Sequence, residues 1–313
     1  MYNEERKLEF IKETCGQSEF TVKYHTSYFD AVEQYERQFN KDLCEFTTEE
    51  FNELFSSGTY AFKSEIVRRR IAMVRRYIGW CNNNGYCDVS LDAINDVVYE
   101  PSAMIKTKLV SSPKDLQEWL DIVFYPVESN TMDVIPRAYF WLAFSGVARS
   151  EITDLTPENV NLNASIIEYN GYTYPIYDEA YSTFESLCTA KQFRIIHPKF
   201  DKYKDRVPGD MLLRGCYKSA TPKSIYYNAL KKITSAQEDD PEIPTFKYTI
   251  IRDCGLFYRI HQMENRGLEP NFDEILDRMP EYVNKSTARA RKSERLYGAK
   301  EDYKLWKKAF GYK

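Results

Sequence analysis

The sequence predicts a mostly α-helical protein with a small β element, and three observations support this fold class. Apolar residues recur at helical spacing along most of the chain, whereas a strand pattern occurs in one short stretch near residue 170. The 313 residues exceed one ordinary core and suit two domains of about 100 and about 200 residues. Hydrophobic residues make up 43% and charged residues 29%, which is typical of a chain that folds throughout.

The first hundred residues are predicted to form helices. Residues 4–14 give one short charged helix, and residues 28–39 give a second. In the string FTTEEF, Thr47 is the expected N-cap and Glu50 lies three positions on. Together these two residues predict a capping box that opens a third helix.

A fourth helix is expected from about residue 64 to residue 83, with a packed face and a basic face. Its apolar residues recur at helical spacing, and arginines flank that stripe. A DNA-contacting surface and a solvated basic face are both compatible with this pattern. The apolar residues are Val67, Ile71, Val74 and Ile78, and the arginines are Arg68, Arg69, Arg75 and Arg76.

A domain boundary is expected after the polar run NNNG, because residues 86–111 show little sustained period. The second domain begins in SSPKDLQEWL, where Ser112 caps a helix and Pro113 takes its first position. The string SIIEYNGYTYPIY predicts a tight hairpin that turns at Asn170 and Gly171. Further helices are expected at 137–144, which is buried, and at about 178–190, 222–235, 248–264 and 286–309.

The net charge of −4 argues mildly against a nucleic-acid partner, but basic residues gather in three segments. Residues 283–313 hold ten Lys and Arg against three acidic residues, and 191–223 hold nine against three. Residues 63–76 hold six against Glu65 alone, whereas 28–57 carry eight acidic residues. A net-acidic chain with such basic segments can bind DNA on one face.

No metal, cofactor or membrane span is expected. The seven cysteines are scattered, and the C-x5-C spacing of Cys81 and Cys87 matches no zinc motif, so reduced core or loop thiols are predicted. Three histidines are too few for a histidine-rich site, and no glycine-rich phosphate loop or nucleotide fingerprint occurs. The most apolar stretch, 134–144, is too short to span a bilayer, so a cytoplasmic protein is expected.

The order of these elements and several strings resemble the tyrosine recombinase (phage integrase) family over nearly the whole chain. The most specific string is FSGVARSEITDLTPENVNL, which is similar to the family's segment with a catalytic Arg just before a Ser-Glu pair. RRYIGWCNNNG precedes it, and TIIRDCGLFYRI and a tyrosine-bearing C-terminal helix follow in the family's order. The resemblance implies an N-terminal helix (1–19), a helical core-binding (SAM-like) domain (20–88), a linker (89–111) and a tyrosine-recombinase-like catalytic domain (112–313).

Most of the family's catalytic residues are missing. The resemblance implies a tyrosine nucleophile, two arginines on the phosphoryl oxygens, and a lysine and histidines that move protons. Ala148 stands at the first arginine's place, with Arg149 one position off, and residues 164–177 contain no lysine. Thr249 stands at a histidine's place, three positions before Arg252, which matches the second arginine.

The nucleophile position is ambiguous, since Tyr297 in RKSERLYG is the better match and Tyr303 the next. Losing one charge-stabilising contact typically costs a factor of about 100 to 1,000 in rate, so several losses leave little phosphoryl-transfer chemistry. We therefore predict a protein that is not an enzyme.

The leading hypothesis is a sequence-specific protein that binds double-stranded DNA on a recombinase scaffold. It would be a transcriptional repressor of a phage or mobile element, similar to integrase-derived phage repressors. Its basic residues would contact phosphates and so position the protein. The expected contacts are Arg68, Arg69, Arg75, Arg76, Lys199, Lys202, Lys204, Arg206, Arg214, Lys223, Arg252, Arg289 and Arg291.

Two alternatives stay open. A divergent but active tyrosine recombinase would use Arg149, Arg252 and Tyr297 as its catalytic residues. A helical protein-interaction module would instead use the acidic segment 28–57 as a partner surface.

The C-terminal segment 297–313 is a candidate for self-association. It places Tyr303, Trp306 and Phe310 at helical spacing among lysines, and the resemblance implies exchange of this tail between subunits. Packing of the same helix on its own domain is equally compatible with the pattern.

Overall fold

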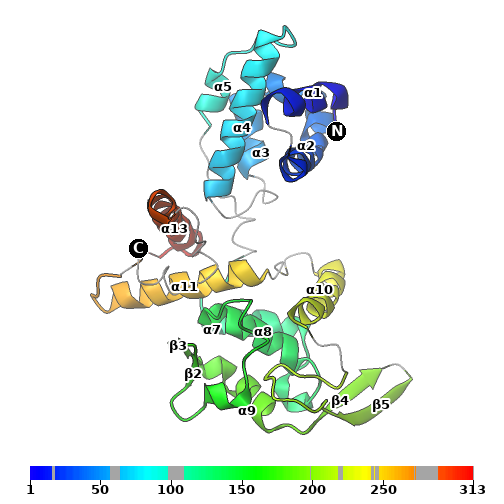
Figure 1. Cartoon of the computed structure of the whole chain (residues 1–313), viewed down its shortest axis with the longest axis vertical. Coiled ribbons are helices and arrows are strands. Elements are labelled where there is room, and N and C mark those ends of the chain that lie inside the picture. Colours follow the sequence, from blue (N-terminus) through cyan, green and yellow to red (C-terminus); the bar gives the residue numbers. More distant parts are fainter. Residues whose placement is uncertain are drawn as a thin grey trace. The chain divides into compact units, whose positions relative to one another are not determined.

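The computed structural model describes residues 1–15, 18–56, 64–97, 109–197, 199–217, 221–240, 243, 247–270, 272 and 288–312. The chain divides into two compact units, Met1–Ile105 and Lys106–Lys313 (Figure 1). Both units are built mainly from helices, and the strands form small antiparallel sheets, so the predicted fold class is confirmed. Among the described residues, none of the helices has both the length and the apolar character that crossing a bilayer requires.

The first unit is a helical bundle with an aromatic core. Phe10 lies edge-on to both Phe29 and Tyr77, and Tyr77 stacks on Trp80. Rings from three helices therefore pack against one another in the core of this unit. Its elements are α1 (Glu4–Thr14), α2 (Glu19–Phe39), the 3-10 turn η1 (Leu43–Glu45), α3 (Thr48–Ser56), α4 (Ser64–Asn83) and the short α5 (Asp92–Asn95).

The predicted spans of α1 and α4 are confirmed, and so is the capping box of α3. The amide of Thr47 donates to the Glu50 carboxylate at 2.8 Å, and the amide of Glu50 donates to the Thr47 hydroxyl at 3.3 Å. Helix α2 begins earlier than the predicted residue 28, because Ser18 acts as an N-cap and accepts a hydrogen bond from the amide of Thr21.

The second unit is organised around the buried helix α8 and its crossing with α11. Gly255 makes this crossing possible, since a Cβ atom at this position would lie 1.9 Å from the carbonyl oxygen of Phe144. The helices are α7 (Pro113–Val123), α8 (Val134–Ser145), α9 (Tyr181–Thr189), α10 (Pro222–Asp239), α11 (Tyr248–Asn265) and α13 (Ala288–Phe310), with short 3-10 turns η3 (Val127–Ser129), η4 (Pro157–Asn159) and η5 (Asp178–Ala180).

The predicted hairpin is confirmed in a three-stranded sheet of order β1-β2-β3, formed by β1 (Val160–Asn161), β2 (Ile166–Tyr169) and β3 (Tyr172–Pro175). Asn170 and Gly171 have φ values of 49° and 77°. A two-residue turn of this kind needs positive φ at both central positions, which Asn and Gly adopt readily.

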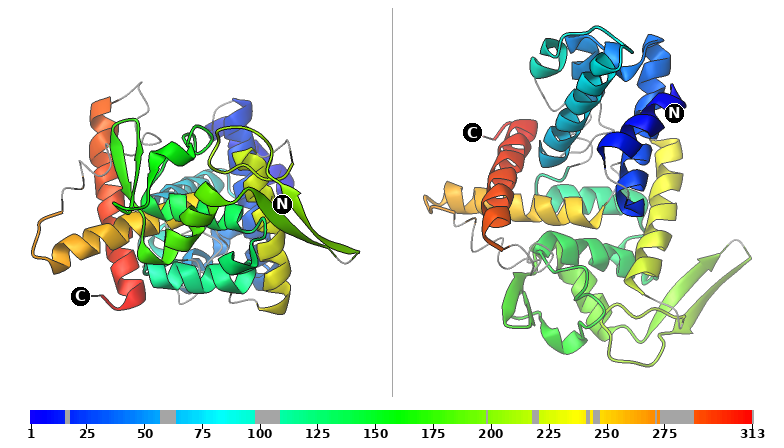
Figure 2. Two further views of the ribbon diagram at one scale, coloured as in Figure 1. Left: turned by 90° about the horizontal axis from the view of Figure 1, so that it is seen from below. Right: turned by 45° about the horizontal axis from the view of Figure 1, so that its top comes forward.

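A second hairpin, β4 (Gln192–His197) with β5 (Phe200–Asp205), corrects the prediction of one small sheet. It extends away from the helices of its unit in both views of Figure 2. Every residue of β5 is exposed, so the strand lacks the alternation of apolar and polar residues that marks a half-buried strand.

Candidate nucleic-acid interface

A basic groove of about 440 Å³ lies between α2 and α4 in the first unit. The α4 residues that line it recur at intervals of three and four, so they share one face of that helix. Arg69 and Arg76 are exposed there, and Arg75 is exposed beside them. The lining residues are Tyr24, His25, Arg69, Arg70, Ala72, Met73 and Arg76.

Among the described residues, the Arg76 guanidinium of the groove is held by neutral groups. The Arg76 guanidinium donates to Cys15 Sγ at 3.2 Å and lies 5.8 Å from the ring centre of Phe10. The Arg70 guanidinium lies 5.0 Å from the ring centre of Tyr28. The contacts of Arg76 with a thiol and a ring face orient its guanidinium without neutralising its charge, which suits it to an anionic ligand.

His25 adds no positive charge to the groove near neutral pH. Its Nδ1 lies 2.7 Å from Met73 Sδ, and burial, together with the charge of Arg76, lowers its pKa below the usual value. The positive character of the groove therefore comes from arginine. The side chain of Arg68 lies outside the described residues.

The β4–β5 hairpin carries three further exposed basic residues among the predicted contacts, Lys199, Lys202 and Lys204. Lys202 Nζ lies 4.9 Å from the ring centre of Phe200, and Lys204 Nζ lies 3.8 Å from that of Tyr217. Residues two apart on a strand share a face, so one face of β5 presents ammonium groups and aromatic rings together. Lys199 is exposed at the tip of the hairpin.

Arg206 is a structural residue and not the phosphate contact that the sequence predicts. Only 8% of it is exposed. Its guanidinium donates to the backbone carbonyls of Leu187 at 2.6 Å, Leu212 at 3.0 Å, Ala190 at 3.1 Å and Arg214 at 3.2 Å. Burial is the main reason that the pKa of Arg206 falls to about 10.

The remaining predicted contacts are spread over different environments. Arg252 is 2% exposed and pairs with Asp253 at 3.2 Å, so it does not offer the surface contact that was expected. Arg214 is half-buried and donates to the carbonyl of Gly209, whereas Lys223 is exposed in the first turn of α10. The side chains of Arg289 and Arg291 lie outside the described residues.

Glu151 connects the turn at residues 147–151 (VARSE) to the β2–β3 hairpin. Its Oε2 accepts from the amide of Ala148 and from the Tyr174 hydroxyl, both at 3.3 Å. Glu151 therefore stabilises the turn through these two hydrogen bonds, although Ala148 stands at the position where an arginine was expected. Arg149 is exposed, and its guanidinium lies 5.5 Å from the ring centre of Tyr226.

Tyr303 is poorly suited to act as a nucleophile. Its hydroxyl donates to Glu264 at 2.6 Å, and burial together with this carboxylate raises its pKa above the usual value. A tyrosine attacks as the phenolate, which a neighbouring carboxylate disfavours. The side chain of Tyr297 lies outside the described residues.

Helix α13 packs on its own unit through aromatic side chains. Trp306 is fully buried, and its Nε1 donates to the carbonyl of Val110 at 3.0 Å. Its ring centre lies 6.2 Å from that of Phe257 in α11. Tyr303 and Trp306 therefore pack inside the second unit. This agrees with the alternative in which the C-terminal helix packs on its own domain.

The structure brings together three cysteines that the sequence leaves scattered. The Sγ atoms of Cys44, Cys81 and Cys87 all lie within 4.8 Å of one another. Cys44 is 37 positions from Cys81, so the spacing of the other two cysteines cannot reveal this cluster. Three thiols at this separation form a donor set that a thiophilic metal ion prefers.

Comparison with known proteins finds a match for the first unit. Residues 1–83 match the family model described as "MrpR, N-terminal core-binding domain", which supports the predicted helical core-binding domain. No curated protein matches the sequence. Among solved structures, the Tn1549 transposon integrase in complex with circular intermediate DNA is similar at 12% identity and a TM-score of 0.36, over 94% of this chain and 98% of the integrase chain.

Proposed function

We propose that this protein is a sequence-specific DNA-binding regulator on a tyrosine-recombinase scaffold that has lost recombination chemistry. It would act as a transcriptional repressor of a phage or mobile element. The observation that carries the proposal is the arginine-lined groove between α2 and α4, which lies in the unit that matches a core-binding domain model. Its ligand would be the phosphate backbone of double-stranded DNA.

The charges of the groove support this choice of ligand. Among the described residues, neither Arg75 nor Arg76 has an acidic partner, although the chain as a whole is net acidic. Guanidinium groups bind phosphate oxygens in a fixed fork geometry. The exposed Tyr24 at the groove edge offers a further polar contact. Further proposed phosphate contacts are Arg69, Lys199, Lys202, Lys204 and Lys223.

The residues at the recombinase positions favour regulation over strand cleavage. Ala148 and Thr249 replace a charge-stabilising arginine and a proton-transferring histidine, and the β2–β3 hairpin carries no lysine. Each of these groups contributes to phosphoryl transfer, but none is needed for holding the DNA backbone. A scaffold with these losses keeps its binding surfaces.

The first experiment measures which DNA the protein selects and through which residues. Tagged protein is incubated with sheared DNA of its source genome at about physiological salt, and the retained fragments are sequenced. Enrichment of a few short repeated sites supports the regulator. An absence of enrichment contradicts it.

Matched variants then test the groove on an enriched fragment. The Arg75→Gln/Arg76→Gln double variant should weaken binding to all sequences and reduce the slope of log K against log salt by about 2. The control is Arg37→Gln/Lys41→Gln, which removes the same charge from side chains paired with Glu33 and Glu50. Equal affinities for the two double variants would refute the assignment of the groove.

A separate assay tests the loss of chemistry. Nicked duplex DNA that contains an enriched site should trap no covalent protein–DNA adduct. An adduct that disappears in Tyr297→Phe, with Tyr303→Phe as the comparison, would instead establish an active recombinase.

A further inference from the structure

Cys44, Cys81 and Cys87 form a cluster in the first unit that the proposed DNA contacts do not use. Cys44 lies in η1, Cys81 in the last turn of α4 and Cys87 in the segment after it. Their Sγ atoms are mutually within 4.8 Å. Cys44 and Cys81 are fully buried, whereas Cys87 is half-buried and leaves a route to solvent.

The spacing of the three sulfur atoms is close to that of a metal-thiolate site. Zinc binds thiolate at about 2.3 Å, so sulfur atoms around a tetrahedral ion lie about 3.8 Å apart. The Sγ atoms now lie within 4.8 Å of one another, so side-chain rotations that move each sulfur by about 1 Å or less would bring them to that separation. Hard cations prefer oxygen ligands, so a site of three sulfurs selects a thiophilic ion.

The surroundings of Cys44 and Cys87 favour the protonated form of these two thiols when no metal is bound. Burial raises the pKa of Cys87 to about 12, and a hydrogen bond with Cys81 together with burial raises that of Cys44. Cys87 Sγ also donates to Asn82 Oδ1 at 2.9 Å. A metal ion that binds thiolates must therefore release protons from this site.

Neighbouring charges are already compensated by one another. Asp42 accepts from the Tyr77 hydroxyl at 3.0 Å, from Asn3 at 2.8 Å and from the amide of Cys44 at 3.1 Å, and Arg6 lies 3.5 Å away. This carboxylate is fixed by other partners, so the three sulfurs are the donors that the cluster offers. Among the described residues, no fourth Cys, His, Asp or Glu belongs to the group.

We propose that Cys44, Cys81 and Cys87 bind one thiophilic divalent ion, of which Zn²⁺ is the biological representative, with an exogenous ligand such as water in the fourth position. The ion would join η1 to the C-terminal end of α4 and to the segment that follows. Because α4 carries the groove arginines, the metal would hold in place the helix that presents them. This site is independent of the proposed function, since metal binding and DNA binding are measured separately.

The test uses the full-length protein, reduced and then freed of reductant under anaerobic conditions, and titrated with Cd²⁺ alone. The expected result is saturation at one Cd²⁺ per chain, with thiolate-to-cadmium charge-transfer absorption and release of up to about three protons. The protein's melting temperature should rise on saturation, because an ion that binds the folded state stabilises it.

Cys87→Ser is the informative variant, since its half-buried position makes it the least disruptive of the three substitutions. It should lower the affinity for Cd²⁺ by at least about 10-fold and reduce the absorption per bound ion. Cys188→Ser is the matched control, because Cys188 is also half-buried but lies in the second unit. It should leave both quantities unchanged.

Three results would overturn the proposal. The first is an absence of charge-transfer absorption at one equivalent of Cd²⁺ in the wild-type protein. The second is an unchanged titration in Cys87→Ser. The third is a disulfide between two of the three cysteines in freshly purified, unreduced protein, identified by peptide mass mapping, because such a bond removes the donor set.

Discussion

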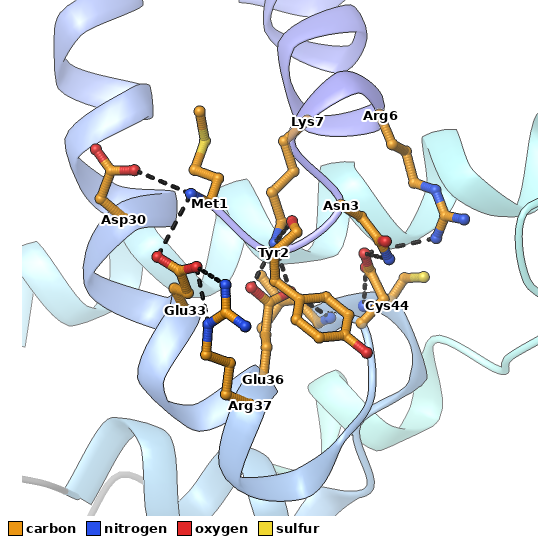
Figure 3. A network of polar contacts seen from close by, with 12 residues as sticks. Met1, Tyr2, Asn3, Arg6, Lys7, Asp30, Glu33, Glu36, Arg37 and Cys44 are labelled. Carbon is orange, nitrogen blue, oxygen red and sulfur yellow. Dashed lines mark hydrogen bonds and ion pairs between the residues drawn. The ribbon is translucent and has the colours of Figure 1, made fainter.

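The Lys7 ammonium donates to both carboxylate oxygens of Glu36, one of them at 2.6 Å, although both side chains are fully buried (Figure 3). The same ammonium donates to the carbonyl of Tyr2 at 2.6 Å, and the amide of Leu43 donates to Glu36 Oε1 at 2.8 Å. One buried pair thus joins α1, α2 and the entry to η1. Each side chain compensates the charge of the other, and removal of either one would leave a single uncompensated charge in the core.

Removing Lys7 alone should destabilise the protein strongly. In Lys7→Met the Glu36 carboxylate loses its counter-charge in a buried position, and breaking such a pair typically costs about 3 to 5 kcal/mol. Urea unfolding of the variant at pH 8, where the Glu36 carboxylate of the wild type is mostly ionised, measures this loss. Lys12→Met, an exposed position in the same helix, is the control and should change stability by less than about 0.5 kcal/mol.

The double variant Lys7→Met/Glu36→Met separates the pair from its surroundings. Apolar residues of similar volume can replace a buried ion pair with little loss, so the double variant should be more stable than Lys7→Met. A double variant that is less stable than the single one would show that Glu36 is needed for another contact, such as the Leu43 amide.

Glu36 should also make stability depend on pH. Its pKa is raised to about 7, mainly by burial and further by the Asp42 carboxylate, although Lys7 and the Leu43 amide lower it. An unfolded glutamate titrates near 4.3, so between about 4.3 and 7 the folded state binds the extra proton. The stability that this residue contributes is fully present below about 4.3 and is lost as the pH rises through about 7.

Urea unfolding between pH 5 and pH 8 checks this dependence. The difference in stability between the wild type and Glu36→Gln should change by up to about 1 kcal/mol per pH unit below pH 7 and level off above it. A difference that stays constant over the whole range would place the pKa of Glu36 near its unfolded value.

Gly255→Ala should disrupt the crossing of α8 and α11. The added methyl group would lie 1.9 Å from the carbonyl oxygen of Phe144, which is backbone and cannot rotate away. A loss of about 3 kcal/mol or more is expected. Gly79→Ala, in α4, meets nothing within 4 Å and should instead stabilise the protein by about 0.5 to 1 kcal/mol. Thermal unfolding of the two variants compares a crowded helical glycine with an open one.

Local signals predict the helices and the first hairpin well, because they depend on neighbours in the sequence. Thr47 and Glu50 are three positions apart, and Asn170 and Gly171 form a turn by themselves. Ser18, the N-cap of α2, is a local signal of the same kind. These features need no knowledge of the tertiary structure.

Features that depend on distant contacts could not be predicted. Every residue of strand β5 is exposed, so the strand carries no apolar–polar alternation from which its pairing with β4 could be predicted. Cys44 meets Cys81 only because η1 packs beside α4. Arg206 looks like its basic neighbours in the sequence, and only the four carbonyls around its guanidinium reveal a structural residue.

Arg206→Met should therefore lower stability and not the intrinsic affinity for DNA. The substitution leaves buried carbonyls without donors, and each unsatisfied polar group costs about 1 to 3 kcal/mol, so a loss of about 3 kcal/mol or more is expected in thermal unfolding. Lys202→Met, on exposed β5, should change stability by less than about 0.5 kcal/mol and weaken DNA binding modestly. DNA affinity is then compared at a temperature where both variants are folded. If Arg206→Met kept its stability but bound DNA more weakly than Lys202→Met, Arg206 would be the phosphate contact that its sequence neighbourhood suggests.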